Sequence, residues 1–256
     1  MEKTQCKGDA SSRNKPLQNS DLSYGDLIVE IGRLFINIPY KEGTLECPGH
    51  EKLIVNLSAF DCTTFVETVI ALTKCAASGN ISQYELKKNL KLIRYRRGKI
   101  DGYASRLHYF TDWLRDNENK KIITDISRRL GGKPQRKKID FMTAHRELYA
   151  ALINEGERRQ LSIMEKNLSR KTFYIIGEKS FGAIKTEFKN GDIIAFATRD
   201  EGLDIAHVGF ALWQGRGLYL LHASKKEGGV VISQKTLLAC LKQNKNYSGI
   251  IAARLL

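Results

Sequence analysis

The spacing of the apolar residues changes near residue 170, and this change limits the possible folds more than any other feature of the chain. Before it, apolar residues recur every three or four positions, as in amphipathic helices, and after it they alternate in short runs, as in half-buried strands. Helices followed by strands predict an α+β protein, in which N-terminal helices pack on a C-terminal antiparallel sheet. We expect helices at about 20–35, 61–73, 82–93, 105–114, 143–153, 157–168 and 235–242, and strands at about 173–176, 193–197, 205–213, 218–223, 230–233 and 250–254.

The first residues differ from the rest in composition. Residues 1–19 are polar and rich in Ser, Asn and Lys, which predicts a flexible tail. The remaining residues, 20–256, are enough for a single domain with a buried core, and we expect a helical insertion around 80–170. No apolar run approaches the roughly 18 residues that a membrane-spanning helix needs. We therefore expect a monomer without an integral membrane segment.

The chain is strongly basic, since 42 Lys and Arg against 28 Asp and Glu give a net charge of +14. Such a surplus attracts polyanions, such as nucleic acid, an anionic lipid surface or an acidic polymer. Two basic runs, 94–99 and 133–138, are expected on the solvated surface, where Tyr95 could help the first run to bind a polyanion. No recognised nucleic-acid-binding motif accompanies them, so we expect no nucleic-acid partner.

The five cysteines have irregular spacing and no C-x-x-C pair, which favours neither a disulfide scaffold nor a zinc ribbon. The usual motifs for phosphates, dinucleotides, zinc proteases and serine hydrolases are absent from the sequence. Carboxylates that meet only in the folded protein leave no local pattern. The candidates that the sequence does show are therefore its cysteines and histidines.

Cys62 lies at the start of an expected helix, directly after Asp61. A helix N-terminus places partial positive charge and unpaired N–H groups beside the sulfur. We expect this position to lower the pKa of the thiol and favour the reactive thiolate. The same N–H groups could hold the oxyanion that forms when the sulfur attacks a carbonyl group. The alternative is that Cys62 is a small buried residue, as we expect for Cys75.

The histidines favour the functional interpretation of Cys62. In the strand 205–213, alternation places His207 and Gly209 on the face opposite the apolar residues. An even-length turn would pair Trp213 with Leu218, and His222 would then lie opposite Gly209. The two imidazoles would be diagonal neighbours within hydrogen-bonding reach. The small side chains on that face would leave room for the helix that carries the cysteine.

A nucleophile, a base and a group that orients the base form the constellation of covalent acyl transfer. The same Cys–His–His set could instead bind zinc. The residue types alone do not separate these two alternatives.

Several segments resemble the NlpC-type papain-like bacterial cell-wall cysteine hydrolases. They are FDCTTFVET at 60–68, NGDIIAFAT at 190–198, LDIAHVGFAL at 203–212 and LLHAS at 220–224. IPYKEGTLE at 38–46 and SRLHYFTDW at 105–113, together with GLDIAHVG, resemble the N-acetylmuramoyl-L-alanine amidase branch. The sequence departs from the common pattern at Thr63 and Thr64, which replace Ser-Gly, and at Ala206, which replaces Ser.

The resemblance implies a papain-like fold with Cys62 as nucleophile, His207 as base, His222 as the orienting residue and Tyr40 lining the site. It implies hydrolysis of the amide bond between N-acetylmuramic acid and L-alanine in peptidoglycan fragments (muropeptides), with or without a 1,6-anhydro sugar, through a thioester. No cofactor and no metal are implied. The substrate places the protein in the periplasm or cell envelope, with the cytoplasm as the alternative.

Two other functions stay open at this point. One is a γ-D-glutamyl–diaminopimelate endopeptidase that acts on the stem peptide, and the other is a basic zinc- or polyanion-binding protein. Further candidates for substrate binding are Arg106, His108 and Trp113, since stacking and bidentate pairing suit sugars and carboxylates, and Asp204, which precedes His207. The alternative is a helix face that packs on the core and exposes Arg106, with Asp204 as an ordinary loop acid.

Overall fold

The computed structural model describes residues 22–47 and 49–256. The predicted tail, 1–19, lies outside the described residues, as do Ser20 and Asp21, which we expected to cap the first helix. The cap of that helix is Ser23, whose hydroxyl accepts a hydrogen bond from the backbone N–H of Asp26 at 3.2 Å. The first helix therefore begins later than the apolar spacing predicted.

The helical elements occupy mainly the first two thirds of the chain. The helices are α1 (Tyr24–Arg33), α2 (Cys62–Ala77), α3 (Gln83–Arg94), α4 (Phe110–Asn119), α5 (Phe141–Ala144), α6 (Glu155–Ser169), α7 (Glu178–Ile184) and α8 (Leu237–Gln243). Short 3-10 turns cover Arg96–Gly98, Tyr103–Ser105, Arg146–Leu148, Ala150–Ile153 and Lys185–Glu187. None of the helices in the described part of the chain is both long and apolar enough to span a membrane.

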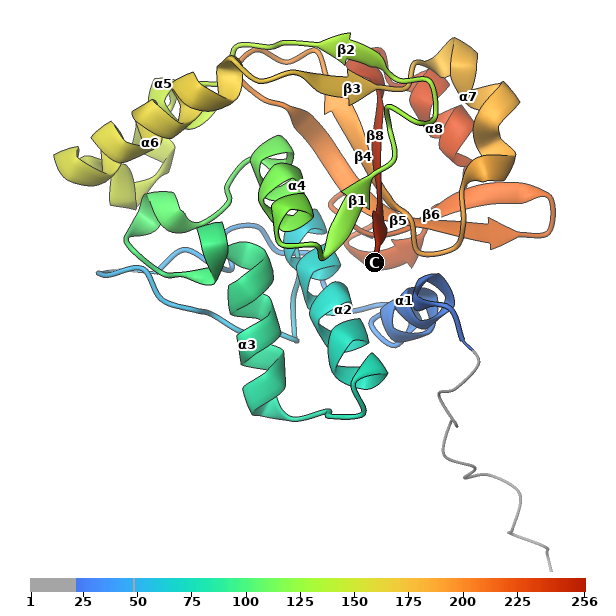
Figure 1. Cartoon of the computed structure of the whole chain (residues 1–256), viewed down its shortest axis with the longest axis horizontal. Helices are drawn as coiled ribbons and strands as arrows, with labels where there is room; N and C mark the ends of the chain where they lie inside the picture. The colour runs from blue at the N-terminus through green and yellow to red at the C-terminus, as the bar shows by residue number, and fades with distance from the viewer. Residues whose placement is uncertain (1–21, 48) are drawn as a thin grey trace, which may run out of the picture.

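The strands form one large sheet and one small pair. They are β1 (Ile123–Asp125), β2 (Lys133–Gln135), β3 (Phe173–Ile175), β4 (Ile193–Thr198), β5 (Ile205–Gln214), β6 (Gly217–Ser224), β7 (Gly229–Ile232) and β8 (Tyr247–Leu255). The large sheet has the order β1-β8-β4-β5-β6-β7 with antiparallel neighbours, and β2 pairs with β3. The predicted α+β fold, with N-terminal helices on an antiparallel sheet, is confirmed (Figure 1).

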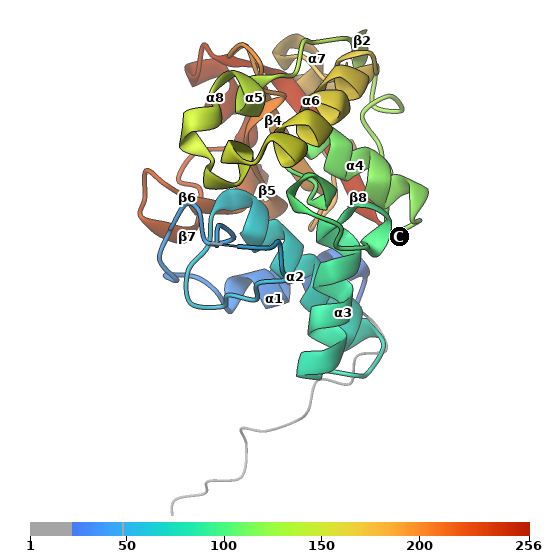
Figure 2. The ribbon, with the colours of Figure 1, turned by 90° about the vertical axis from the view of Figure 1, so that its left-hand side faces the viewer.

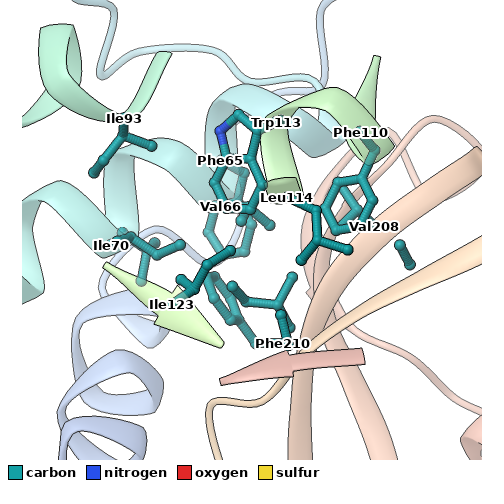
Figure 3. Packing of buried hydrophobic residues seen from close by; sticks show 14 of the residues in the cluster. Phe65, Val66, Ile70, Ile93, Phe110, Trp113, Leu114, Ile123, Val208 and Phe210 are labelled. Carbon is teal, nitrogen blue, oxygen red and sulfur yellow. The ribbon is translucent and has the colours of Figure 1, made fainter. Parts of the chain in front are cut away.

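Two layers of helices cover the two faces of the sheet. On one face α2 packs through Phe65, whose ring contacts that of Phe210 with centroids 5.9 Å apart (Figure 3). On the other face Phe181 of α7 and Leu237 of α8 pack against Ala211 of β5. The outcome is a central sheet between α1 and α2 on one side and α7 and α8 on the other (Figure 1).

The helical region between α2 and the sheet differs from two of our predictions. The helix expected at 105–114 begins only at Phe110, because the backbone N–H of Leu107 pairs with the carbonyl of Arg94 instead. The helix expected at 143–153 stops after Ala144 and continues as two 3-10 turns, because the backbone of His145, with φ −116° and ψ 42°, leaves the helical region. Here α5 lies beside α6, and the Thr143 N–H donates to Glu165 Oε1 at 3.2 Å (Figure 2).

The basic run at 94–99 is only partly the solvated surface that we expected, since Arg97 and Lys99 are exposed but other residues of the run are not. Arg94 and Tyr95 are buried, at 2% and 1% exposure. The Arg94 Nε donates to Glu67 Oε2 of α2 at 2.7 Å, and the Tyr95 hydroxyl donates to Glu51 Oε1 at 2.7 Å. This part of the run binds protein carboxylates and is not available to a polyanion. The second run, 133–138, is mostly exposed, as predicted.

Candidate active site

Cys62 is the first residue of α2, and the cap of that helix leaves N–H groups beside it. The Asp61 carboxylate accepts from the Thr64 N–H at 2.7 Å, and the Thr64 hydroxyl accepts from the Asp61 N–H at 3.0 Å. A helix start leaves four backbone N–H groups without a partner inside the helix. These two hydrogen bonds form a capping box, which uses the first group, of Asp61, and the last, of Thr64. Among the described hydrogen bonds, the N–H group of Thr63 stays available for a ligand, and that of Cys62 bonds only to its own sulfur.

The two predicted histidines are in contact. Trp213 pairs with Leu218, as the even-length turn predicted. His207 Nε2 lies 2.6 Å from His222 Nδ1, with the ring planes at 82°. Gly209 makes this approach possible, because an added Cβ there would lie 2.7 Å from the His222 Cβ.

The short contact requires one proton between the two facing ring nitrogens. Burial lowers the pKa of His207 to about 4, and burial together with the nearby His207 lowers that of His222 to about 3. Both rings are therefore neutral near pH 7, and one proton lies between the two facing nitrogens. When His207 Nε2 donates it to His222 Nδ1, the other nitrogen of His207, Nδ1, is left as a proton acceptor.

The helix that carries Cys62 lies on a side of β5 that we did not expect. We placed the Cys62 helix on the histidine face, but α2 packs on the opposite face, against Val208 and Phe210. The pairing of β5 with β6 ends at Phe210–Leu221, so the residues of β5 before Phe210 are not paired with β6 in this register. Val208 lies in the part of β5 that pairs with β4 but not with β6. Its backbone makes a hydrogen bond to the sulfur.

The pKa of Cys62 is raised to about 12, which contradicts our expectation of a lowered value. Burial is the main cause, and the charge of Asp61 adds to it, while hydrogen bonds from the Val208 backbone and the Thr63 side chain lower the pKa. Since Asp61 caps the helix, the negative charge of the cap lies next to the thiol and opposes ionisation. In the free protein the sulfur is therefore a thiol near pH 7.

Cys62 and His207 line one small pocket of about 170 Å³ at the start of α4. Most of the other lining side chains are apolar or aromatic. They include His108, Tyr109, Phe110, Trp113, Tyr149 and Leu203. The pocket gives a ligand access to the thiol of Cys62 and the imidazole of His207 together.

His108 and Trp113, two of the predicted substrate-binding residues, line this pocket. His108 Nε2 lies 2.9 Å from the carbonyl oxygen of Tyr103, so it carries a proton and donates it. Burial, with the charge of Arg106, lowers the pKa of His108 to about 3. Trp113 stacks on Phe110 with centroids 5.5 Å apart, and its buried Nε1 has no hydrogen-bond partner among the described residues (Figure 3).

Tyr40 lies close to the nucleophile but outside the pocket lining. Its backbone forms a parallel bridge with Phe60, two residues before Cys62. Burial raises the pKa of its hydroxyl, and the nearby Cys62, Glu42 and Asp61 raise it further. The hydroxyl therefore stays protonated, and in this structure it donates a hydrogen bond to Glu42 Oε1 at 3.4 Å.

Arg106 and Asp204 are occupied by contacts within the protein. Arg106 is 4% exposed, is not part of the pocket lining and donates to Glu46 Oε1 at 2.6 Å, so the exposed helical position that we considered is wrong as well. Asp204 lines the pocket, but its Oδ2 accepts from the Thr111 N–H at 2.6 Å and hydroxyl at 2.8 Å. Its Oδ1 accepts from the N–H of Ile205 at 2.8 Å. Asp204 thus connects the start of α4 to β5, a role that its place in the sequence does not reveal.

The zinc alternative finds little support in the geometry. Residues 22–47 and 49–256 contain no group of three His, Cys, Asp or Glu side chains placed to hold a metal ion. One nitrogen of each imidazole is already used in the contact between His207 and His222. The described cysteines, Cys47, Cys62, Cys75 and Cys240, are all free thiols.

Sequence analysis left out the groups that complete the site around the sulfur. These are the backbone of Val208 and the aromatic side chains of Tyr109 and Tyr149. The cap was the part that the sequence could have suggested, because Asp is among the residues preferred at a helix N-cap. The tyrosines meet the pocket only through tertiary packing.

The fold agrees with solved structures of bacterial proteins. An N-acetylmuramoyl-L-alanine amidase from Bacteroides uniformis is 36% identical, with a TM-score of 0.86, and the match covers 91% of this chain and 99% of that one. A Bacteroides fragilis structure, provisionally assigned as a xylanase, is 39% identical with a TM-score of 0.82, over 88% of this chain and 100% of that one. A Legionella pneumophila protein with 22% identity and a TM-score of 0.70, over 92% and 90% of the two chains, shares the fold.

These matches define the class, an α+β fold shared with bacterial amidases. The model of the AmiA-like family, described as N-acetylmuramoyl-L-alanine amidase-like, matches residues 30–250, and the chain belongs to this family. A search of curated proteins gives no match.

Proposed function

We propose that this protein is a cysteine-dependent N-acetylmuramoyl-L-alanine amidase that acts on peptidoglycan fragments in the periplasm or cell envelope. The observation that carries the proposal is the 2.6 Å contact between His207 and His222, at a pocket that His207 shares with Cys62. Membership of the amidase-like family supports the choice of bond.

The first step is attack on the lactyl carbonyl of the muramoyl group. As the Cys62 sulfur bonds to the carbonyl carbon, its proton passes to Nδ1 of His207, so that a free thiolate never accumulates. This order follows from the raised pKa of the thiol and the lowered pKa of the imidazole. The N–H groups of Cys62 and Thr63, at the positive end of α2, hold the oxyanion.

The second step releases the peptide. The carbon–nitrogen bond breaks, and His207 returns the proton to the departing amine of L-alanine, which leaves a muramoyl thioester on Cys62. A water molecule then gives a proton to His207 and attacks the thioester. The carbon–sulfur bond breaks, and His207 returns the proton to the sulfur.

His222 and Tyr40 have supporting roles in this mechanism. His222 accepts the Nε2 proton of His207 and so keeps Nδ1 as the base. It also stabilises the imidazolium that forms when the thiol proton arrives. The protonated hydroxyl of Tyr40 is a further donor near the sulfur.

The test is product analysis with purified muropeptides. Release of the glycan without a peptide supports the amidase, whereas a disaccharide–dipeptide would identify a γ-D-glutamyl–diaminopimelate endopeptidase instead. Cys62→Ala and His207→Ala should remove nearly all turnover, and His222→Asn should retain more activity. Cys47→Ser, which changes another free cysteine, is the matched control.

Capture of the intermediate tests the chemistry independently of the product. Rapid acid quench and mass spectrometry should find the muramoyl group on the peptide that contains Cys62. Full activity of Cys62→Ala, or equal small losses from all three substitutions, would refute the assignment.

A further inference from the structure

A second pocket, of about 530 Å³, borders the same two histidines, and the mechanism above does not use it. Its lining includes Ala206, His207 and His222 but neither Cys62 nor any residue of α4. The rest of its wall comes from the β6–β7 turn, the segment before α8, α8 itself and the start of β8. It includes Lys225, Lys226, Glu227, Lys235, Cys240 and Tyr247.

The order of bond breaking fixes which part of the substrate can reach each pocket. The acyl group ends on the Cys62 sulfur, so the muramoyl part must lie on the side of the pocket that contains Cys62. The leaving amine must lie within hydrogen-bonding reach of His207, which gives it a proton. The chain beyond that nitrogen, which is the stem peptide, therefore runs past His207 toward the second pocket.

The charges of the two pockets differ in the way that this orientation requires. Asp204 is the charged residue that lines the Cys62 pocket, and its carboxylate is occupied by Thr111 and Ile205. That pocket suits an uncharged sugar, which can pack on its aromatic wall. The second pocket has three lysines on its wall, and a stem peptide with D-glutamate and diaminopimelate carries several carboxylates.

Two of the three lysines keep their charge available for a ligand. Lys225 already pairs with Glu42, at 3.0 and 3.2 Å, and Glu227 adds a negative charge to the wall. Lys235 donates to Gln243, which is a neutral partner. Lys226 is exposed on the turn between β6 and β7.

We propose that this second pocket is the stem-peptide subsite, in which Lys226 and Lys235 bind the carboxylates beyond L-alanine. The proposal rests on the proposed amidase function, because that reaction sets the direction of the substrate. Under this proposal the basic surface recognises the acidic peptide of the substrate and not its sugar.

The experiment compares two substrates on the Lys226→Gln/Lys235→Gln variant. One is a muramoyl tripeptide with free carboxylates, and the other is muramoyl-L-alanine amide, which has no charge beyond the scissile bond. Exposed ion pairs contribute about 0.7 kcal/mol each, so kcat/KM for the tripeptide should fall about tenfold, through KM. The value for the amide should change less than about twofold, because this substrate does not reach the lysines.

Lys242→Gln/Lys245→Gln removes the same charge from two exposed lysines outside the pocket lining and is the matched control. The control should retain the wild-type preference for the tripeptide. An equal loss on both substrates, or the same loss in the control, would overturn the proposal, since it would indicate a general electrostatic effect.

A binding measurement separates failure of this proposal from failure of the amidase assignment. Calorimetry with the free acidic tripeptide on the Cys62→Ala protein should give binding that the Lys226→Gln/Lys235→Gln substitutions weaken about tenfold. Wild-type protein that cleaves neither substrate would refute the amidase, whatever the peptide does. Cleavage with no effect of the two lysines on binding would refute the subsite alone.

Discussion

The buried ion pair between Arg94 and Glu67 should make a large contribution to stability. Glu67 lies on α2, five positions after Cys62, and the two side chains are 3% and 2% exposed. The Arg94 Nε donates to Glu67 Oε2 at 2.7 Å, and its Nη1 donates to the carbonyl of Ile54 at 2.6 Å. Burial raises the pKa of Glu67, and Arg94 is the main group that opposes this rise. The pair therefore joins α2, which carries Cys62, to α3.

Arg94→Met removes the cation and leaves Glu67 buried without its partner. Removing one member of a buried pair costs about 3 to 5 kcal/mol, which lowers Tm by about 6 to 20 °C in a domain of this size. The cost should be greatest at alkaline pH, where Glu67 is held charged, and smaller at acidic pH. The sign follows from the raised pKa, because a carboxyl group with a raised folded-state pKa loses stability as pH rises above its unfolded value.

Urea unfolding and thermal melts at two pH values measure this effect. The double variant Arg94→Met/Glu67→Met should lose much less than the sum of the two single losses, because no buried charge is left unpaired. Lys88→Ala, which breaks the exposed pair with Glu85, is the control and should cost at most about 1 kcal/mol. A loss for Arg94→Met no larger than that of Lys88→Ala, or additive single losses, would refute the reasoning.

Four other results follow from the site. The pKa is about 4 for His207 and about 12 for Cys62, so kcat/KM should be constant through neutral pH and fall only toward pH 4. A change in kcat/KM between about pH 6 and 8 would contradict an uncharged thiol and imidazole. Gly209→Ala would place a Cβ 2.7 Å from that of His222 and displace the imidazole. We expect kcat to fall at least about tenfold with a smaller change in KM. Wild-type kinetics would refute the close packing of Gly209 on His222. Asp61→Asn keeps a capping side chain but removes its charge, so the pKa of Cys62 should fall and iodoacetamide should react faster at pH 8, and an unchanged rate would refute the effect of Asp61. The pKa of His222 in the folded protein, about 3, lies below its value in the unfolded chain. The free energy of unfolding should therefore depend less on pH in His222→Gln, by up to about 1.4 kcal/mol per pH unit between about pH 4 and 6. Urea titrations across that range would show or exclude this difference.

The sequence predicts the large strands because each is a short apolar run, rich in β-branched and aromatic residues, that lies between turn residues. In β5 the apolar face packs on α2, so the period of two is visible without the structure. The strands that we missed have three residues each: β1, which pairs Ile123 with Leu255, and β2. Three residues cannot show a period, and their strand geometry depends on partners far along the chain.

The segment 105–114 shows how tertiary contacts override local spacing. Its apolar residues recur as in a helix, but Leu107 donates its backbone N–H to Arg94, and Asp204 accepts the backbone N–H of Thr111 at the start of α4. Both partners lie outside the segment, one 13 and the other 93 positions away. No pattern within ten residues carries that information.

Some features of the candidate site depend on nearby residues in the sequence, and others depend on distant ones. The contact of His207 with His222 needs only the parity of one short turn, which the sequence contains, so the register arithmetic found it. The protonation state of Cys62 depends on burial, on where β5 and β6 stop pairing and on the backbone of Val208. A helix start alone argues for a thiolate, but burial and the charge of Asp61 outweigh it. In the proposed mechanism the imidazole must therefore take the proton during attack, and this is the function that we propose for the histidine pair.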